Sequence, residues 1–237
     1  MTRSTSLPPK VLSIAGSDSG GGAGIQADLK AFARCGVHGM TAITAVTAQN
    51  TVAVTGVYPL PPAAIVEQVR AVVEDIGVDA VKIGMLGTAD TIAAVDRALD
   101  LVGDAPIVLD PVMVAESGAR LLDEDAEEVL RTRLLRRVAV VTPNLPEARV
   151  LAGAQETPGA PDAPGEDEAE LLARAILARG PRAVVVTGGH RETAADLFLD
   201  GDRLVEIPGE RHPGGAGHGS GCTHSSALAA HLALGFE

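Results

Sequence analysis

Short apolar runs rich in β-branched residues alternate along this chain with segments whose apolar residues recur every three or four positions. The predicted strands are residues 11–15, 40–46, 79–83, 107–109, 138–141 and 183–187. Helical segments separate them, and strand and helix alternate at least five times without an internal repeat or a linker. Parallel strands need such crossovers, so this order predicts a parallel-rich sheet covered on both faces within a single domain.

The remaining segments complete this prediction. Residues 52–58 continue as extended chain, and residues 195–199 and 204–207 form a predicted hairpin around Asp200-Gly201-Asp202. The Gly/Pro/Asp-rich residues 153–167 are a predicted exposed loop. The predicted helices are residues 25–35, 61–76, 89–101 (capped by Thr88), 123–136, a helix beginning at 147, and 167–179.

Composition excludes several classes of function. The chain has 237 residues, 19 basic against 31 acidic side chains and only 2% aromatic residues. A net charge of −12 disfavours a surface for nucleic-acid backbones, and the aromatic platforms on which single-stranded bases stack are missing. Two cysteines fit a reducing compartment, and neither a signal peptide nor a membrane span is visible. These features predict a cytoplasmic protein with no nucleic-acid or membrane partner.

Polar and flexible residues follow the predicted strands. Because the carboxyl ends of parallel strands meet at one edge of a sheet, where α/β proteins bind ligands, these residues predict one shared site. They are Gly16–Gly24, Gln49, Gly84–Met85, Asp110, Asn144 and Glu147, and Thr187–Gly189.

The first of these segments has five glycines in nine residues, between the predicted strand that ends at Gly16 and the helix that ends before Gly36. It matches neither the dinucleotide-binding glycine pattern nor the P-loop pattern. Asp18 and Asp28 bracket the glycines. Carboxylates beside flexible backbone suit a polar, uncharged ligand with hydroxyl or amine donors.

A second glycine-rich segment, His218-Gly219-Ser220-Gly221-Cys222-Thr223, leads into a predicted helix. The first N–H groups of a helix lack internal partners and carry partial positive charge, so small residues there make an anion pocket. A thiol in that position is expected to have a lowered pKa and to act as a base or a nucleophile.

Asp110 and Glu147 follow separate strands and are a natural pair of ligands for Mg²⁺. An anion pocket, a metal pair and a weak base are the parts needed for phosphoryl transfer to a hydroxyl group. A cysteine hydrolase is the rival use of Cys222, with His218 or His224 as its partner. Cysteine and histidine spacings do not fit a zinc site.

Seven segments together resemble the ribokinase-like kinases, and within them the hydroxymethylpyrimidine/phosphomethylpyrimidine kinases of thiamine biosynthesis. The similarity runs from about residue 11 to 235. The segments are 15–28 (AGSDSGGGAGIQAD), 47–51 (TAQNT), 82–86 (KIGML), 110–113 (DPVM), 142–148 (TPNLPEA), 187–190 (TGGH) and the segment around Cys222.

The resemblance implies a three-layer α/β/α kinase that uses ATP and Mg²⁺. It would phosphorylate 4-amino-5-hydroxymethyl-2-methylpyrimidine and then its monophosphate. Cys222 would be the base, beside an anion hole of Gly219, Ser220 and Gly221. The implied metal and phosphate residues are Asp110, Asn144 and Glu147; the implied pyrimidine pocket is Gly16, Asp28, Gln49, Met85 and Val112; and Thr187 and Gly189 would hold the nucleotide.

Two departures from the family pattern accompany the resemblance. Gly214-Gly215-Ala216-Gly217 stands where relatives usually carry a polar pair, and the chain ends about one helix after Cys222. We therefore expect a loose lead-in over 1–10 and a single kinase domain over 11–237 that lacks the C-terminal helices. A vitamin B6 kinase and a catalytically weak pyrimidine-binding module are the alternatives, and a homodimer is expected.

Overall fold

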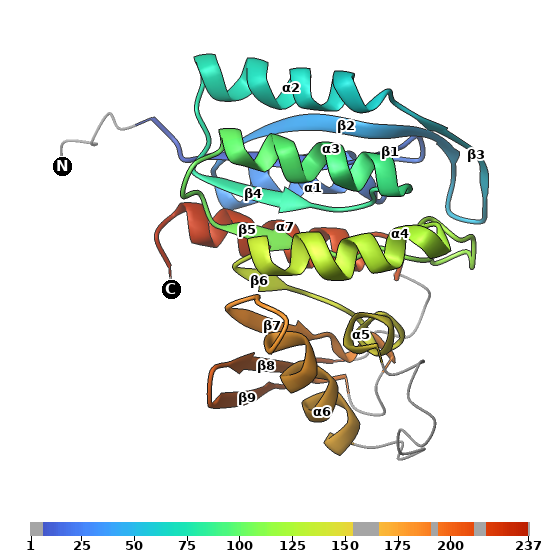
Figure 1. Cartoon of the computed structure of the whole chain (residues 1–237), viewed down its shortest axis with the longest axis vertical. Coiled ribbons are helices and arrows are strands. Elements are labelled where there is room, and N and C mark those ends of the chain that lie inside the picture. Colours follow the sequence, from blue (N-terminus) through green and yellow to red (C-terminus); the bar gives the residue numbers. More distant parts are fainter. Residues whose placement is uncertain (1–6, 154–165, 191–193, 211–216, 237) are drawn as a thin grey trace.

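The structure is a computed structural model that describes residues 7–153, 166–190, 194–210 and 217–236. Nine strands form one sheet (Figure 1). They are β1 (Lys10–Asp18), β2 (His38–Gln49), β3 (Val54–Pro59), β4 (Ala80–Ile83), β5 (Ile107–Leu109), β6 (Val140–Val141), β7 (Ala183–Val186), β8 (Asp196–Asp200) and β9 (Arg203–Ile207).

Seven α-helices accompany the sheet in the described part of the chain. They are α1 (Gly24–Cys35), α2 (Pro62–Asp75), α3 (Ala89–Ala98), α4 (Glu124–Val129), α5 (Leu145–Ala152), α6 (Glu166–Leu177) and α7 (Ser220–Ala233). Short 3₁₀ turns cover Leu99–Leu101, Leu135–Arg137 and Gly188–His190, and a π turn covers Leu130–Leu134. None of the helices in the described residues is both long and apolar enough to cross a bilayer.

The strand order is β3-β2-β1-β4-β5-β6-β7-β8-β9. The pairs from β2 through β7 are parallel, whereas β3, β8 and β9 pair antiparallel at the two edges. The prediction of a mainly parallel α/β sheet is confirmed, as is the hairpin of β8 and β9. The carboxyl ends of the central strands therefore meet at one edge of the sheet, as expected.

Helices cover both faces of the sheet, because side chains along each strand alternate between two separate cores. Leu12 and Ile14 of β1 pack in the core under α2 to α6. Val11 belongs to the other core, with Phe32 of α1 and Ala229 of α7. Figure 1 shows α2, α3 and α4 side by side on one face and α1 and α7 on the other. The result is the expected three-layer α/β/α arrangement.

Several boundaries differ from the predictions. β1 does not end at Gly16 but continues through Asp18, because β2 pairs with it as far as Thr47 after an irregularity between Ala15 and Ser17. A Cβ on Gly16 would lie only 3.0 Å from the Met85 sulfur, so glycine allows β1 to lie close to Met85 at this irregularity. The predicted helix 123–136 is α-helical only to Val129, and β6 has two residues instead of four.

Two local signals are confirmed. The Thr88 side chain accepts a hydrogen bond from the Thr91 N–H and caps α3, and Gly36 ends α1 with a φ of 79°. Most of the predicted loop at 153–167, and Gly214 to Ala216, lie outside the described residues. β1 begins at Lys10, so this residue belongs to the sheet instead of the predicted lead-in.

Candidate active site

A cavity of about 450 Å³ lies at the carboxyl ends of the central strands. Most of the residues predicted for the site line it. They are Gln49, Asp110, Val112, Asn144, Glu147, Thr187, Gly189, Gly219, Ser220, Gly221 and Cys222. Residues up to 201 positions apart in the chain, from Ala23 to His224, thus share one cavity.

The two glycine-rich segments contact each other at the start of α7. Gly219 has a φ of 79°, and a Cβ there would lie 1.8 Å from the Gly22 carbonyl oxygen, so no side chain fits. His218 Nε2 lies 2.9 Å from Asp18 Oδ2 and joins the same segments through their side chains. This contact sets where the first turn of α7 begins.

Asp18 organises its own loop. Its carboxylate, 1% exposed, accepts hydrogen bonds from the N–H groups of Gly20, Gly22 and Ala23 at 2.8–2.9 Å. Burial alone would raise the pKa of Asp18, but these bonds and His218 lower it below the usual value. The expectation that Asp18 offers its carboxylate to a ligand is therefore wrong, because its oxygens hold the loop.

One N–H group of the predicted anion hole, that of Ser220, is already bonded in the first turn of α7. The Ser220 N–H donates to the Gly217 carbonyl at 3.0 Å, and the Thr223 N–H donates to Gly219 at 2.9 Å. The helix provides no i−4 carbonyl for the intervening Gly221 and Cys222. Their N–H groups are therefore the ones placed to meet an anion, and Ser220 contributes through its position in the turn.

The Cys222 thiol is only partly exposed. Burial raises its pKa to about 12; the Asp110 and Asp28 carboxylates add to this rise, whereas the Lys82 ammonium and the Gly24 N–H oppose it. The predicted lowering of the pKa is wrong, since burial among carboxylates outweighs the start of the helix. Cys222 is therefore a neutral thiol in the free protein.

A capping box places Glu147. Asn144 Oδ1 accepts the Glu147 N–H at 2.9 Å, and Glu147 Oε2 accepts the Asn144 N–H at 3.0 Å. Glu147 Oε1 also accepts the Met113 N–H at 3.4 Å. The Asn-x-x-Glu segment is thus a structural unit that starts α5 and fixes the carboxylate at the cavity.

Asp110 faces the same cavity and is 5% exposed. Its Oδ2 accepts a hydrogen bond from the Ser225 hydroxyl at 3.2 Å and lies 3.8 Å from Lys82 Nζ. A Cβ on Gly221 would lie 3.9 Å from both Asp110 oxygens, so the start of α7 is packed beside this carboxylate. Burial raises the pKa of Asp110, and Lys82 opposes that rise.

The two carboxylates fit a divalent cation. Burial raises the pKa of Glu147 to about 8, and the charge of Asp110 adds to this rise. A cation would relieve this repulsion. No group of three or more acidic, histidine or cysteine ligands occurs among the described residues. Two carboxylates suit Mg²⁺, which usually takes its other ligands from water and phosphate.

Three residues implied for the pyrimidine pocket do not line the cavity: Gly16, Asp28 and Met85. Gly16 and Met85 lie side by side, and Met85 is 8% exposed. Asp28 is fully buried and accepts hydrogen bonds from Ser13, Lys82 and Ser226. Its carboxylate lies beneath the site, inside the core between α1, α7 and the sheet.

Sequence reasoning missed several lining residues. Asp196 of β8 accepts the Gly188 N–H at 2.7 Å, and its carboxylate lies 3.8 Å from His224 Nε2. It thereby holds the turn after β7 close to α7. No pattern marks Asp196, because it lies at the start of a strand, whereas the site was predicted from residues that follow strands. His218 contacts Asp18, and His224 lies beside Asp196. These contacts therefore give the cysteine-hydrolase hypothesis no histidine partner for Cys222.

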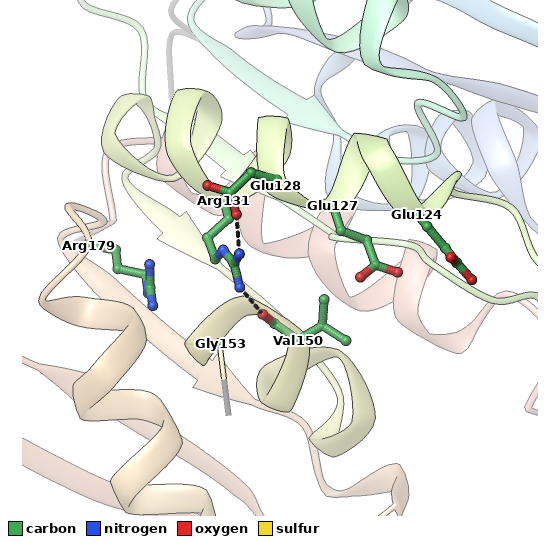
Figure 2. A pocket seen from close by; sticks show the side chains of 7 residues that line it. All are labelled: Glu124, Glu127, Glu128, Arg131, Val150, Gly153 and Arg179. Carbon is green, nitrogen blue, oxygen red and sulfur yellow. Dashed lines mark hydrogen bonds and ion pairs between the residues drawn. The ribbon is translucent and has the colours of Figure 1, made fainter. Parts of the chain in front are cut away.

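A second hollow, of about 600 Å³, is lined by residues of α4 and α5 and by Arg179, which follows α6 (Figure 2). Arg131 pairs with Glu128 and donates to the Val150 carbonyl at 3.3 Å. Arg179 donates to the Ala152 carbonyl at 2.9 Å. These cations cap the carboxyl end of α5, the helix whose other end holds Glu147.

The mainly parallel sheet between two layers of helices is the fold of the ribokinase-like kinases, whose solved structures match this chain. A family model described as phosphomethylpyrimidine kinase matches residues 18–237. The chain belongs to this family, and it is a kinase.

Relatives agree with this assignment. A hydroxymethylpyrimidine/phosphomethylpyrimidine kinase of Rhizobium meliloti is 50% identical, over 94% of this chain and 82% of the relative. The crystal structure of a phosphomethylpyrimidine kinase from Clostridium difficile is 39% identical with a TM-score of 0.83, covering 97% of this chain and 92% of that one. A Bacillus subtilis pyridoxal kinase in complex with ADP is 38% identical, also with a TM-score of 0.83, over 97% and 86%.

Proposed function

We propose that this kinase phosphorylates 4-amino-5-hydroxymethyl-2-methylpyrimidine on its hydroxymethyl group and then converts the monophosphate to the diphosphate, for thiamine biosynthesis. Mg²⁺ and ATP take part in both steps. The observation that carries the proposal is the shared cavity in which Cys222 and the start of α7 face Asp110 and Glu147. The family assignment and the names of the relatives support the choice of substrate.

The phosphate side of the cavity has the donors that phosphoryl transfer needs. The N–H groups of Gly221 and Cys222 bind the oxygens of the transferred group, where negative charge is spread in the transition state. Asp110 and Glu147 would hold the metal ion, which would neutralise phosphate charge. Thr187 and Gly189 bind the nucleotide from the turn after β7.

The acceptor side holds the aminopyrimidine. Gln49 and Val112 line the cavity and offer an amide and an apolar contact to the flat ring. Gly16 and Met85, which lie side by side, and the buried Asp28 remain part of the proposed pyrimidine site, although they do not line the cavity.

Cys222 receives the proton of the attacking hydroxyl group. A thiol that is neutral at rest must first release its own proton to solvent in the open cavity, and the Lys82 ammonium favours the resulting thiolate. The thiolate then takes the proton of the attacking hydroxyl group and becomes a neutral thiol again. A thiolate present in only a small fraction of molecules is sufficient, since positioning and charge stabilisation account for most of the rate in phosphoryl transfer. The proposal also includes a homodimer, a cytoplasmic location and a single kinase domain that begins with β1 at Lys10.

A competition assay tests the substrate. The purified protein is given Mg-ATP with equal concentrations of the hydroxymethylpyrimidine, its monophosphate and pyridoxal, and products are identified by mass spectrometry. We expect consumption of the hydroxymethylpyrimidine and formation of its diphosphate to dominate over formation of pyridoxal phosphate. Preferred phosphorylation of pyridoxal would refute the proposal, and binding of the pyrimidine without ATP turnover would favour a binding module.

Two cysteine variants control the assay. Cys222→Ala is expected to lower kcat at least about a hundredfold, because it removes the base. Cys35→Ala is expected to change kcat little, because Cys35 ends α1 away from the cavity lining. Equal, small losses in both variants would mean that the Cys222 sulfur only packs.

A further inference from the structure

Lys82 is the middle charge of a cluster buried between the sheet and helices α1 and α7. It is fully buried, and it stands on β4 between Val81 and Ile83. These two neighbours pack in the core on the opposite face, so strand alternation points Lys82 toward α1 and α7. Its ammonium therefore lies under the start of α7, away from solvent.

Asp28 of α1 holds the ammonium in place. Lys82 Nζ donates to both Asp28 oxygens, at 3.0 and 3.2 Å. The Ser13 hydroxyl donates to Oδ2 at 2.6 Å and the Ser226 hydroxyl donates to Oδ1 at 2.7 Å. Both Asp28 oxygens are thus saturated by groups from β1, β4 and α7, which leaves the ammonium little freedom.

The same ammonium reaches the active site. Its nitrogen lies 3.8 Å from Asp110 Oδ2, and Asp110 lines the cavity. The Lys82 ammonium thus lies between two carboxylates. Asp28 lies beneath the site and has all its hydrogen bonds filled, and Asp110 lies at the cavity wall. A Cβ on Gly84 would lie 2.8 Å from Lys82 Nζ, so the glycine after β4 leaves the space that the ammonium occupies.

Stability alone does not account for this arrangement. Removing a charge pair from water costs several kcal/mol per ion, and apolar residues of similar size are often equally or more stabilising in its place. The two flanking residues of β4 are apolar, and an apolar side chain would extend the core of Val11, Phe32 and Ala229. The cation is better explained by what it does to the wall of the cavity.

We propose that Lys82 is a positioning residue for phosphoryl transfer, whose ammonium, fixed by Asp28, orients the Asp110 carboxylate and balances the negative charge beneath Cys222. This inference rests on the proposed function. Lys82 does not touch the substrate, because it lies behind Asp110 and does not line the cavity. Its loss therefore affects the chemical step more than binding of the acceptor.

The experiment compares two variants that differ only in the ammonium. In a Cys35→Ser background, which leaves Cys222 as the single thiol, Asp28→Asn is compared with Asp28→Asn/Lys82→Met. The double variant has no unpaired Lys82 or Asp28 charge. Three quantities are measured: kcat, KM for the acceptor, and the rate of Cys222 alkylation by iodoacetamide at one fixed alkaline pH.

We expect the additional Lys82→Met substitution to slow alkylation about tenfold, because the nearest cation is lost from a low-dielectric site. It should lower kcat about a hundredfold while KM for the acceptor changes less than about threefold. Asp28→Asn alone should speed alkylation relative to the Cys35→Ser parent, the opposite direction, because it removes a carboxylate near the thiol.

The proposal would be overturned if the alkylation rate and kcat of Asp28→Asn/Lys82→Met were within about twofold of those of Asp28→Asn. If the double variant does not fold, Asp28→Asn/Lys82→Gln replaces it, because two amides can share a hydrogen bond, and the same criteria apply. Alkylation needs neither ATP nor acceptor, and kcat is measured on whichever alcohol the parent phosphorylates. The Lys82 result can therefore be interpreted even if the protein does not phosphorylate the proposed pyrimidine.

Discussion

Replacing Gly219 with alanine tests whether the contact between the two glycine-rich segments is rigid. Gly219 has a φ of 79°, and the added Cβ would lie 1.8 Å from the Gly22 carbonyl oxygen and 2.8 Å from its carbon. Both neighbours are backbone atoms, so the segments must separate. Because α7 begins at this point, the N–H groups of Gly221 and Cys222 would move with it.

Gly36 is a matched control. It also has a φ of 79°, but no atom lies within 4 Å of the position its Cβ would take. Gly36→Ala therefore measures the cost of the left-handed backbone alone, roughly 1–2 kcal/mol. In a chain of this size that cost lowers Tm by roughly 2–8 °C. Any loss in Gly219→Ala beyond this amount comes from the collision.

We expect Gly219→Ala to lower the free energy of unfolding by about 3 kcal/mol or more, as the backbone strain and the collision add. Its kcat should fall at least about a hundredfold, because displaced N–H donors no longer meet the developing charge. Gly36→Ala should keep the parent kcat. Differential scanning fluorimetry and the kinase assay measure both effects. A Gly219→Ala protein as stable as Gly36→Ala, with kcat within about threefold of the parent, would refute this reasoning.

Two further predictions concern the thiol and the capping box. In a Cys35→Ser protein, the raised pKa of Cys222 predicts iodoacetamide alkylation that rises about tenfold per pH unit from about pH 7 to about pH 10; a plateau below about pH 9 would mean that the thiolate is more stable than its burial implies. Asn144→Ala and Thr88→Ala each remove a helix-capping side chain and should each cost about 1 kcal/mol in thermal unfolding. Only Asn144→Ala should also raise the Mg²⁺ concentration for half-maximal rate, because it releases Glu147, and an equal Mg²⁺ response in both variants would argue against that role.

Local sequence signals predicted most of the fold. Period and β-branched content located the strands, Thr88 and Gly36 marked helix ends, and the strand–helix alternation predicted the parallel sheet. The predicted end of an element was wrong where pairing with a neighbouring strand sets that end. Gly16 was expected to end its strand, but β2 pairs past it to Asp18. The helix from 123 changes to a π turn at Leu130, for which the residues carry no signal.

The candidate site was predicted for a related reason. Polar residues after parallel strands must meet at one edge, so Asp110, Asn144 and Glu147 could be grouped without coordinates. Cys222 was added to them because an anion pocket, a metal pair and a base are the parts that phosphoryl transfer needs. Their chemistry could not be derived in the same way. Asp18 was expected to face a ligand and instead binds its own loop, and Cys222 was expected to have a lowered pKa and instead has a raised one.

The sequence by itself determined the sheet, the edge that carries the site and the residue types found there, because periodicity and glycine placement act over a few neighbouring positions. Only the tertiary structure decided which carboxylates reach the cavity and which are buried beneath it. Burial and charge depend on contacts such as Lys82 with Asp28 and His218 with Asp18, whose partners lie 54 and 200 positions apart. Chain folding brings such pairs together, and their distances then set the pKa values and the free donors of the site.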